Sequence, residues 1–408
     1  MPYHGLSMTA TDPASPPEAF ERQDTVFASA FAILQKAMAQ KAFPAASVAI
    51  THRGGLVGLK ALGKFIYESQ PEELAPVRKD RIAAGAPPFS RSLREGGDFD
   101  LDVTPTTLFD LASLTKVVAT TPMAMLLYQR GLLDLDAPVS SIVPEFISDA
   151  TKDPRRREVT LRMLLAHSSG LPAYEKLFLK HHTRPQLLQA AFTTPLAANP
   201  GTRAAYSDIG FILLGTALER LADESLDRFC QREIFAPLAM TNITFNPPTQ
   251  IRRQIPPTQD DQTFRHRIIQ GEVYDENASV LGGVAPQAGL FSTAEDLAKF
   301  ACAMLNTGRS ILRPETIALF TRRESASPNT SRALGWDTPS SQSQSGKYFS
   351  PTSYGHLGYT GTSLWIDPVR QLSITLLTNR TWPDDSNQAI KQVRPTFHDA
   401  VIEALENA

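Results

Sequence analysis

The chain reads Phe109-Asp110-Leu111-Ala112-Ser113-Leu114-Thr115-Lys116 where a strand-like segment passes into an apolar helical one. This pattern predicts that Ser113 opens a helix. Residues i and i+3 of a helix share a face, so the Lys116 amine can reach the Ser113 hydroxyl. A serine hydroxyl needs an adjacent base to be a good nucleophile at neutral pH, and a lysine of lowered pKa can be that base. The tetrad therefore supplies a candidate nucleophile and its proton acceptor.

The tetrad also has a structural alternative, because serine is a common N-cap residue and lysine is common on helix surfaces. Two later stretches favour the chemical interpretation. One follows the turn signal Asn199-Pro200-Gly201 and reads Ala205-Tyr206-Ser207-Asp208-Ile209-Gly210-Phe211. The other reads Gly355-His356-Leu357-Gly358-Tyr359-Thr360-Gly361-Thr362 and precedes a strand-like segment.

In this order the three stretches resemble the signature motifs of the serine β-lactamase and penicillin-binding-protein superfamily, S-x-x-K with S-D-N and K-T-G. The similarity is closest to the class C β-lactamase-like branch, where the middle motif is Tyr-x-Asn. Residues 164–172 and 278–293 also resemble segments of that branch. The resemblance covers residues 24–64 and 104–405, and it implies a β-lactamase/transpeptidase-like fold.

The resemblance also implies a role for each matched residue. Ser113 would be the acylated nucleophile, Lys116 its base and Tyr206 the proton relay. The backbone N–H groups of Ser113 and Tyr359 would form the oxyanion hole. The residues expected to contact substrate are Asp208, His356, Gly358 and Tyr359.

Two positions depart from the family pattern. Asp208 stands where the branch has asparagine, so an ionised acceptor would either hold Lys116 protonated or polarise it. His356 replaces the lysine of K-T-G, which helps to bind the substrate carboxylate in β-lactamases and D,D-peptidases. Histidine has an unperturbed pKa near ~6.5 and is only partly charged at pH 7. We therefore expect weaker carboxylate anchoring.

The middle stretch has an alternative alignment, since Ser207-Asp208-Ile209 begins like S-D-N. That alignment places Ile209 where a hydrogen-bonding amide is required. We therefore prefer Tyr206, whose phenol titrates near ~10 and would relay a proton if the cationic Lys116 lowers its pKa. The other possibility is a structural tyrosine with a satisfied hydroxyl. His167, beside a Gly-Leu-Pro turn, is interpreted as a structural hydrogen-bonding residue.

The composition is typical of a globular enzyme, with 408 residues of which 42% are apolar and 20% charged. A net charge of −2 gives no electrostatic footprint for nucleic acid. No apolar run reaches the roughly 18 to 20 residues of a membrane span. Residues 1–17 lack the hydrophobic region of a signal peptide, so we expect a cytoplasmic protein, or a periplasmic one if the true start lies upstream.

Neither a metal nor a cofactor is expected. Cys230 and Cys302 lack metal-ligand spacing and are interpreted as buried thiols. The sequence contains neither G-x-S-x-G nor the zinc, phosphate-loop and dinucleotide motifs.

Strands are predicted at residues 45–52, 56–60, 362–366 and 372–378, and terminal helices at residues 20–40 and 395–407. This order predicts an α/β (α+β) fold, in which an antiparallel sheet built from both ends of the chain is flanked by N- and C-terminal helices. Residues 113–310 would form an inserted, mainly helical region. The helix that begins at Ser113 is expected to continue to Tyr128, with Pro122 causing a kink near Val118.

We expect one catalytic domain over residues 1–408, with a disordered tail at residues 1–20. Residues 65–106 are rich in Pro, Gly and Arg and form a predicted loop insertion, which is either solvated or overhangs the active site.

Together these observations predict a serine hydrolase that works through an acyl-enzyme on a small-molecule or peptide ester or amide. Esterase, D,D-carboxypeptidase-like and weak β-lactamase activities fit this prediction. The alternative is a non-catalytic binding or assembly protein on the same scaffold. The joint presence of Ser113, Lys116 and Tyr206 argues against it, while the natural substrate and the oligomeric state stay open.

Overall fold

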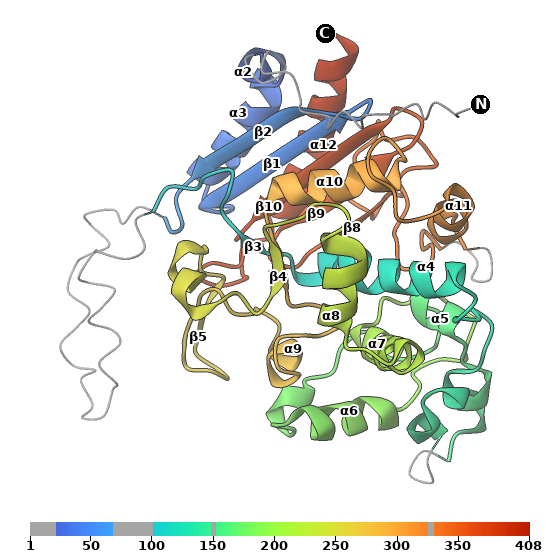
Figure 1. Cartoon of the computed structure of the whole chain (residues 1–408). Coiled ribbons are helices and arrows are strands. Elements are labelled where there is room, and N and C mark those ends of the chain that lie inside the picture. Colours follow the sequence, from blue (N-terminus) through green and yellow to red (C-terminus); the bar gives the residue numbers. More distant parts are fainter. Residues whose placement is uncertain (1–21, 68–100, 148–151, 325–329) are drawn as a thin grey trace, which may run out of the picture.

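The computed structural model of the chain describes residues 22–67, 101–147, 152–324 and 330–408 (Figure 1). The predicted tail at residues 1–20 lies outside these residues, and the insertion at residues 65–106 is described only at its two ends. Those ends lie together, because the Phe65 N–H donates to the Leu101 carbonyl at 3.0 Å and the Val103 N–H donates to the Gly63 carbonyl at 3.0 Å.

A five-stranded antiparallel sheet joins the two ends of the chain, as predicted. Its strand order is β2-β1-β10-β9-β8. Strand β1 lies between β2 and β10, with Ala46 opposite Thr378 and Leu62. The strands are β1 (Ala45–His52), β2 (Gly55–Gly63), β8 (Tyr354–Leu357), β9 (Ser363–Asp367) and β10 (Leu372–Thr378).

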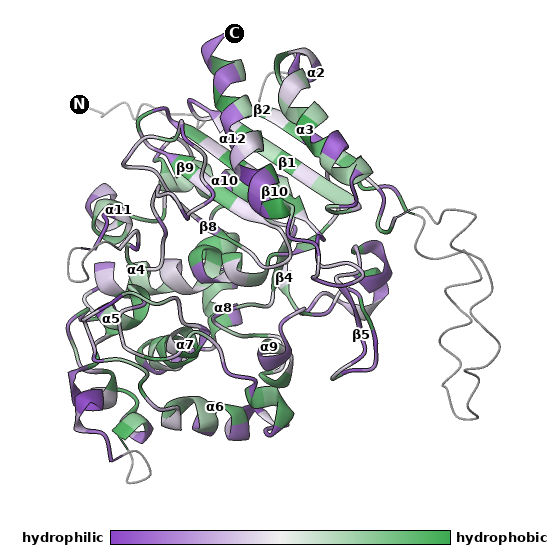
Figure 2. Ribbon diagram, turned by 180° about the vertical axis from the view of Figure 1, so that it is seen from behind, coloured by the Kyte–Doolittle hydropathy of each residue, from purple (hydrophilic) through white to green (hydrophobic). Residues whose placement is uncertain are grey.

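Helices cover both faces of this sheet. Helices α2 (Gln23–Val26), α3 (Ala28–Ala39) and α12 (Ile390–Glu406) lie on one face, and α10 (Ala294–Met304) lies on the other (Figure 1). Alternate residues of a strand point to opposite faces. Accordingly, Val48 packs in the core beneath α3 and α12, whereas Ala49 packs in the core shared with α10. Strand β1 is therefore buried from Ala45 to Thr51, and Figure 2 shows mainly white and green residues there.

Helix α12 begins earlier than predicted. It starts at Ile390, so Pro395 lies inside the helix rather than at its first residue. A proline removes its own N–H donor, but the rest of the turn can be supported by tertiary packing. Ile390 and Arg394 are both buried, which supplies that packing.

The structure also differs from the continuous helix that was predicted to begin at Ser113. Three short pieces replace it: a 3₁₀ turn at Ala112–Leu114, a π-helical turn at Lys116–Thr120 and helix α4 (Thr121–Gln129). Ser113 thus lies inside the first piece. Pro122 has no N–H to donate to the Val118 carbonyl, and the wider π-helical turn accommodates that missing bond. The expected kink is therefore a change of helix type.

The inserted region between β2 and β8 is mainly helical, as predicted, and lies beside the five-stranded sheet (Figure 1). Its further helices are α5 (Leu161–Leu165), α6 (Arg184–Thr193), α7 (Asp208–Ala222), α8 (Leu226–Cys230), α9 (Glu276–Val280) and α11 (Pro314–Thr321). A small sheet has the order β3-β7-β4, formed by β3 (Phe109–Asp110), β7 (Leu290–Ser292) and β4 (Ile243–Phe245). A two-stranded ribbon consists of β5 (Gln259–Asp261) and β6 (Arg267–Ile269).

Short helical turns complete the described structure. The 3₁₀ turns are Val139–Ser141, Pro144–Ile147, Pro154–Glu158, Leu177–Leu179 and Thr249–Gln254, and a second π-helical turn is Gln231–Phe235. None of the helices in the described part of the chain is long and apolar enough to cross a membrane.

Candidate active site

The structure brings all the predicted site residues to the junction of the sheet and the helical region. Ser113 and Lys116 follow the short strand β3, and Tyr206 and Asp208 lie at the start of α7. His356 lies on β8, with Gly358 and Tyr359 directly after it. Segments from the middle and the C-terminal part of the chain thus converge on one serine.

Ser113 makes the two contacts that its predicted chemistry requires. Lys116 Nζ lies 3.2 Å from Ser113 Oγ, and the Tyr206 hydroxyl oxygen lies 2.7 Å from the same atom. The expected i, i+3 contact forms although the backbone is a 3₁₀ turn, since that turn also brings residues three apart onto one side. A positive φ of 46° at Ala112 precedes the serine.

Lys116 is buried and surrounded by acceptors. Its Nζ lies 2.9 Å from the Gln287 carbonyl oxygen and 2.6 Å from Asp208 Oδ1, in addition to Ser113. These three partners match the three donors of an ammonium group. Burial lowers the pKa of Lys116, whereas Asp208 opposes that shift by its charge and its hydrogen bond. The amine is therefore unprotonated more often near neutral pH than an exposed lysine, and Asp208 stabilises its protonated form.

Tyr206 is a neutral phenol rather than an activated phenolate. Burial and the nearby Asp208 carboxylate raise its pKa well above the ordinary value. The condition stated above, a Tyr206 pKa lowered by Lys116, is therefore not met, because burial and the Asp208 carboxylate raise that pKa. The hydroxyl lies 3.0 Å from Asp208 Oδ1. The hydroxyl can thus donate its one proton either to Ser113 Oγ or to Asp208.

His356 is uncharged and offers an acceptor. Its Nδ1 lies 2.8 Å from the Leu357 carbonyl oxygen, so Nδ1 carries the proton and Nε2 has the free lone pair. Burial and then the cations of Arg332 and Lys116 place its pKa well below the ordinary value. Nε2 is buried and has no hydrogen-bond partner among the described residues. His356 is thus neutral at pH 7, not partly charged as expected.

His167 supports Tyr206 from behind, in agreement with the predicted structural role. Its Nδ1 accepts a hydrogen bond from the Ser207 N–H at 3.1 Å. Its ring lies 4.8 Å from the Tyr206 ring and 5.0 Å from the Phe211 ring, between centroids. These contacts fix the direction in which the phenol points.

Gly358 is required by backbone packing beside the serine. A Cβ atom at this position would lie 1.9 Å from Thr362 Oγ1 and 2.5 Å from the Leu111 carbonyl oxygen. The neighbouring Tyr359 is half exposed and donates a hydrogen bond from its hydroxyl to Asp385. The glycine thus lets the end of β8 approach the turn that carries Ser113.

A basic cavity of about 390 Å³ opens on one side of Ser113. His356 lines it, and so do four cationic side chains from later in the chain, namely Arg332, Arg380, Lys391 and Arg394. The guanidinium of Arg332 lies 5.5 Å from the centre of the Tyr206 ring. The expectation of weak carboxylate anchoring considered only His356, and these four cations were not predicted.

A second cavity, which is acidic and has a volume of about 550 Å³, also opens at Ser113. Ser113, Tyr206 and Tyr359 line both cavities. The carboxylates that line the acidic cavity are Asp208, Asp275, Glu276 and Asp385. Burial and the charge of Asp208 raise the pKa of Asp275 to about 7.

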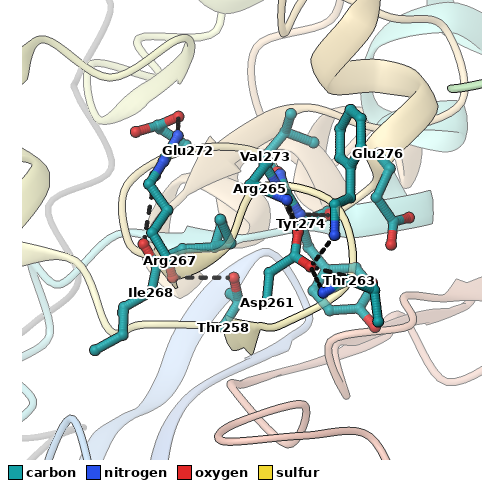
Figure 3. Close-up of polar contacts among 12 residues, drawn as sticks. Thr258, Asp261, Thr263, Arg265, Arg267, Ile268, Glu272, Val273, Tyr274 and Glu276 are labelled. Atoms are coloured by element: carbon teal, nitrogen blue, oxygen red, sulfur yellow. Dashed lines mark hydrogen bonds and ion pairs between the residues drawn. The ribbon is translucent and has the colours of Figure 1, made fainter. Parts of the chain in front are cut away.

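A polar network outside the acidic cavity holds part of its wall in place (Figure 3). Arg265 donates to the Val273 carbonyl at 2.7 Å and to the Tyr274 carbonyl at 2.8 Å. The same guanidinium forms an ion pair with the buried Asp261, with Nε 2.9 Å from Oδ2. The β5–β6 ribbon is thereby connected to the segment directly before α9. Glu276 is the first residue of that helix.

The sequence analysis did not identify most of the residues that line the two cavities. Asp275, Glu276 and Gln287 lie within or beside residues 278–293, which carry the family resemblance and could have indicated them. Arg332 and Arg380 lie in stretches without a recognisable pattern. The described residues contain no group of histidine, cysteine and acidic side chains that could hold a metal ion.

Comparisons with known proteins agree with this geometry. A Beta-lactamase family model matches residues 31–395. The "Putative D-alanyl-D-alanine carboxypeptidase" of Escherichia coli (strain K12) is 34% identical over 303 residues, which are 67% of this chain and 69% of that protein. The N-acetylmuramyl-L-alanine amidase of Bacillus subtilis (strain 168) is 35% identical over 306 residues, which are 67% of this chain and 68% of that protein.

Solved structures share the fold at lower sequence identity. EstCE1, a hydrolase with promiscuous acyltransferase activity, has a TM-score of 0.68 at 20% identity and covers 93% of this chain and 99% of its own. A class C β-lactamase from Rhodobacter sphaeroides has a TM-score of 0.64 at 21% identity, with coverage of 93% and 99%. The chain belongs to the Beta-lactamase family and is a serine hydrolase of that family.

Proposed function

We propose that Ser113 is the nucleophile of this hydrolase and that Lys116 and Tyr206 move its proton. The observation that supports this assignment is the placement of an amine and a phenol oxygen 3.2 and 2.7 Å from Ser113 Oγ. A hydroxyl with two proton-transfer groups in hydrogen-bond reach has the geometry of an activated nucleophile.

The reaction has two halves. In the first, Ser113 Oγ attacks the substrate carbonyl while its proton passes to the unprotonated Lys116 amine, and an oxyanion forms on the carbonyl oxygen. That oxyanion is bound by the backbone N–H groups of Ser113 and Tyr359. The proton then passes through Tyr206 to the leaving group as its bond to the carbonyl carbon breaks. In the second half, water repeats these steps on the acyl-enzyme and releases the acid and Ser113.

The basic cavity favours a leaving group that carries a carboxylate. Arg332, Arg380 and Lys391 line it together with the uncharged His356. Guanidinium and ammonium groups bind carboxylates by charge-assisted hydrogen bonds. A peptide whose leaving amino acid has a free carboxylate fits this cavity, as would the substrate of a D,D-carboxypeptidase. The relative from Escherichia coli carries that name.

Intact-mass measurement tests the nucleophile. The wild-type protein and Ser113→Ala are each exposed to a fluorescent penicillin and to a 4-nitrophenyl ester. We expect a Ser113-dependent adduct with the penicillin or Ser113-dependent release of 4-nitrophenol, with a loss of at least about a thousandfold in the variant. Equal behaviour of the two proteins toward both compounds would contradict the proposal and favour a non-catalytic binding protein.

A second experiment tests the leaving group. Release of D-alanine from diacetyl-lysyl-D-alanyl-D-alanine is compared with cleavage of the same peptide ending in a C-terminal amide. We expect the free carboxylate to raise kcat/KM by about tenfold or more, and Arg332→Gln to reduce that preference. Equal kcat/KM for the acid and the amide would contradict a carboxylate-binding role of the basic cavity.

A further inference from the structure

The acidic cavity beside Ser113 contains charged groups that the proton transfers described above do not use. It is lined by the carboxylates of Asp275, Glu276 and Asp385, besides Asp208, which pairs with Lys116. Lys176, which is exposed, is the one basic side chain among the lining residues. Three acidic side chains thus face a cavity with one basic side chain in its lining, and the Arg380 guanidinium lies 4.4 Å from the centre of the Tyr359 ring.

The walls of this cavity are also aromatic. The Tyr274 and Tyr359 rings are stacked with their centroids 5.6 Å apart and their planes at 29°. Tyr174 adds a third ring and donates a hydrogen bond to Glu276 Oε2 at 3.3 Å. The negative faces of aromatic rings attract cations, and carboxylates at the same place strengthen that attraction.

A buried amide provides an independent sign of a missing donor. Gln287 is 1% exposed, lines the cavity and donates from Nε2 to Asp275 Oδ1 at 3.4 Å. Its Oε1 is buried and has no hydrogen-bond partner in the parts of the chain that the structure describes. A buried acceptor without a donor is costly, so a ligand with N–H groups would satisfy it.

The position of His356 indicates which part of a substrate lies in the acidic cavity. His356 lines only the basic cavity, whereas Asp208 and Gln287 line only the acidic one. If the leaving group carries its carboxylate into the basic cavity, as proposed above, then the acidic cavity is the other space at Ser113 that the acyl group can occupy.

We propose that the acidic cavity binds a primary ammonium group in the acyl portion of the substrate, between the carboxylates of Asp275 and Glu276, the Gln287 amide oxygen and the tyrosine rings. This inference rests on the proposed function, because it assigns the acyl side of the same cleft. The preferred substrate then carries a positive charge on the acyl side of the scissile bond and a negative charge on the other side.

Two esters that differ only in this charge test the inference. The probes are the 4-nitrophenyl esters of trans-4-(aminomethyl)cyclohexanecarboxylic acid and of trans-4-ethylcyclohexanecarboxylic acid. They have the same leaving group and nearly the same shape, and the trans ring prevents the amine from attacking its own ester. We expect kcat/KM to be about tenfold higher for the aminomethyl ester, which is the size of a desolvated cation–aromatic and carboxylate contact.

Variants that each remove one carboxylate test whether the preference for the aminomethyl ester arises in the acidic cavity. Glu276→Gln should reduce the ratio of the two kcat/KM values by about threefold or more, since it removes one carboxylate from the cavity. Glu175→Gln removes the same charge from an exposed position that does not line the cavity, and should leave the ratio unchanged.

The outcomes separate the two proposals. Ser113-dependent hydrolysis of both esters at equal kcat/KM would overturn the ammonium site and leave the proposed function intact. An equal loss of preference in Glu276→Gln and Glu175→Gln would also overturn the site, because it would show only long-range attraction. The absence of Ser113-dependent hydrolysis of either ester, together with equal behaviour of the wild type and Ser113→Ala toward the penicillin, would overturn the proposed function itself.

Discussion

At the level of single side chains, the pairing of Lys116 with Asp208 distinguishes this site from the family pattern. An asparagine at that position could both donate and accept, whereas the carboxylate only accepts and carries a charge 2.6 Å from Nζ. Asp208 therefore influences the protonation of both proposed proton-transfer groups. It favours the protonated form of Lys116 and raises the pKa of Tyr206.

Replacement of this carboxylate should change the pH dependence of catalysis. In Asp208→Asn the charge that raises the pKa of Lys116 is gone, while the burial that lowers it remains. The amine then loses its proton at lower pH. Because the proposed base must be unprotonated, the acidic limb of kcat/KM against pH should move to lower pH. The profile is measured with a 4-nitrophenyl ester.

Asp385→Asn is a matched control for this shift. It removes one carboxylate from the same cavity without changing a group that contacts Lys116, so its acidic limb should stay where the wild-type limb lies. A limb that moves to higher pH in Asp208→Asn, or does not move, would contradict the role of Lys116 as the base.

At the level of elements, the turn after β8 is fixed to the serine by contacts that leave no room for a side chain. Gly358→Ala places a methyl group against Thr362 and the Leu111 carbonyl. Such overpacking costs about 1–3 kcal/mol and should displace residues 358–359 from Ser113. We expect a large fall in kcat/KM for esters together with a modest fall in the free energy of unfolding. Wild-type kcat/KM in a folded variant would show that this contact does not position the site.

Helix α12 holds the same turn from the other side. The buried Arg394 donates from Nη2 to the carbonyls of Gly358 at 2.7 Å and Thr362 at 2.9 Å, and from Nε to the Gly361 carbonyl at 3.3 Å. A lysine keeps the charge but cannot reach all three carbonyls. Arg394→Lys should therefore lower the free energy of unfolding by about 2–4 kcal/mol, as measured in urea. An unchanged urea midpoint would show that these bonds contribute little.

At the level of the whole molecule, the sheet and the helical region share one core. The same cluster of buried side chains contains Ala45 and Ile366 from the sheet and Leu218 from α7. Regions that share a core are expected to unfold together, although the chain is larger than a typical two-state domain.

A substitution far from the sheet tests this coupling. Leu218→Ala should cost about 2–5 kcal/mol, because it removes a fully buried side chain from α7. The three tryptophans, Trp336, Trp365 and Trp382, all lie after α11 and report mainly on the C-terminal part. Urea unfolding curves from tryptophan fluorescence and from circular dichroism should shift together. Separate shifts would indicate that the two regions unfold independently.

Local patterns were enough to predict much of the architecture and the reacting groups. The contact of Ser113 with Lys116 depends on a spacing of three residues, which a 3₁₀ turn and an α-helix both bring onto one side. Strand β1 was predicted at its observed bounds, because an apolar run followed by a turn signal indicates a strand wherever it lies. Tyr206 and His356 were found through motifs that carry the family resemblance.

The sequence by itself thus determined the fold class and the candidate reacting residues, through short-range spacing, hydrophobic pattern and motifs that carry the family resemblance. Only the tertiary structure decided the environment of those residues. Burial reversed the expected pKa shift of Tyr206 and made His356 neutral. Folding also brought Arg332 to one cavity at Ser113 and Glu276 to a second one. Charge and solvation depend on which distant segments meet, and no local pattern records that.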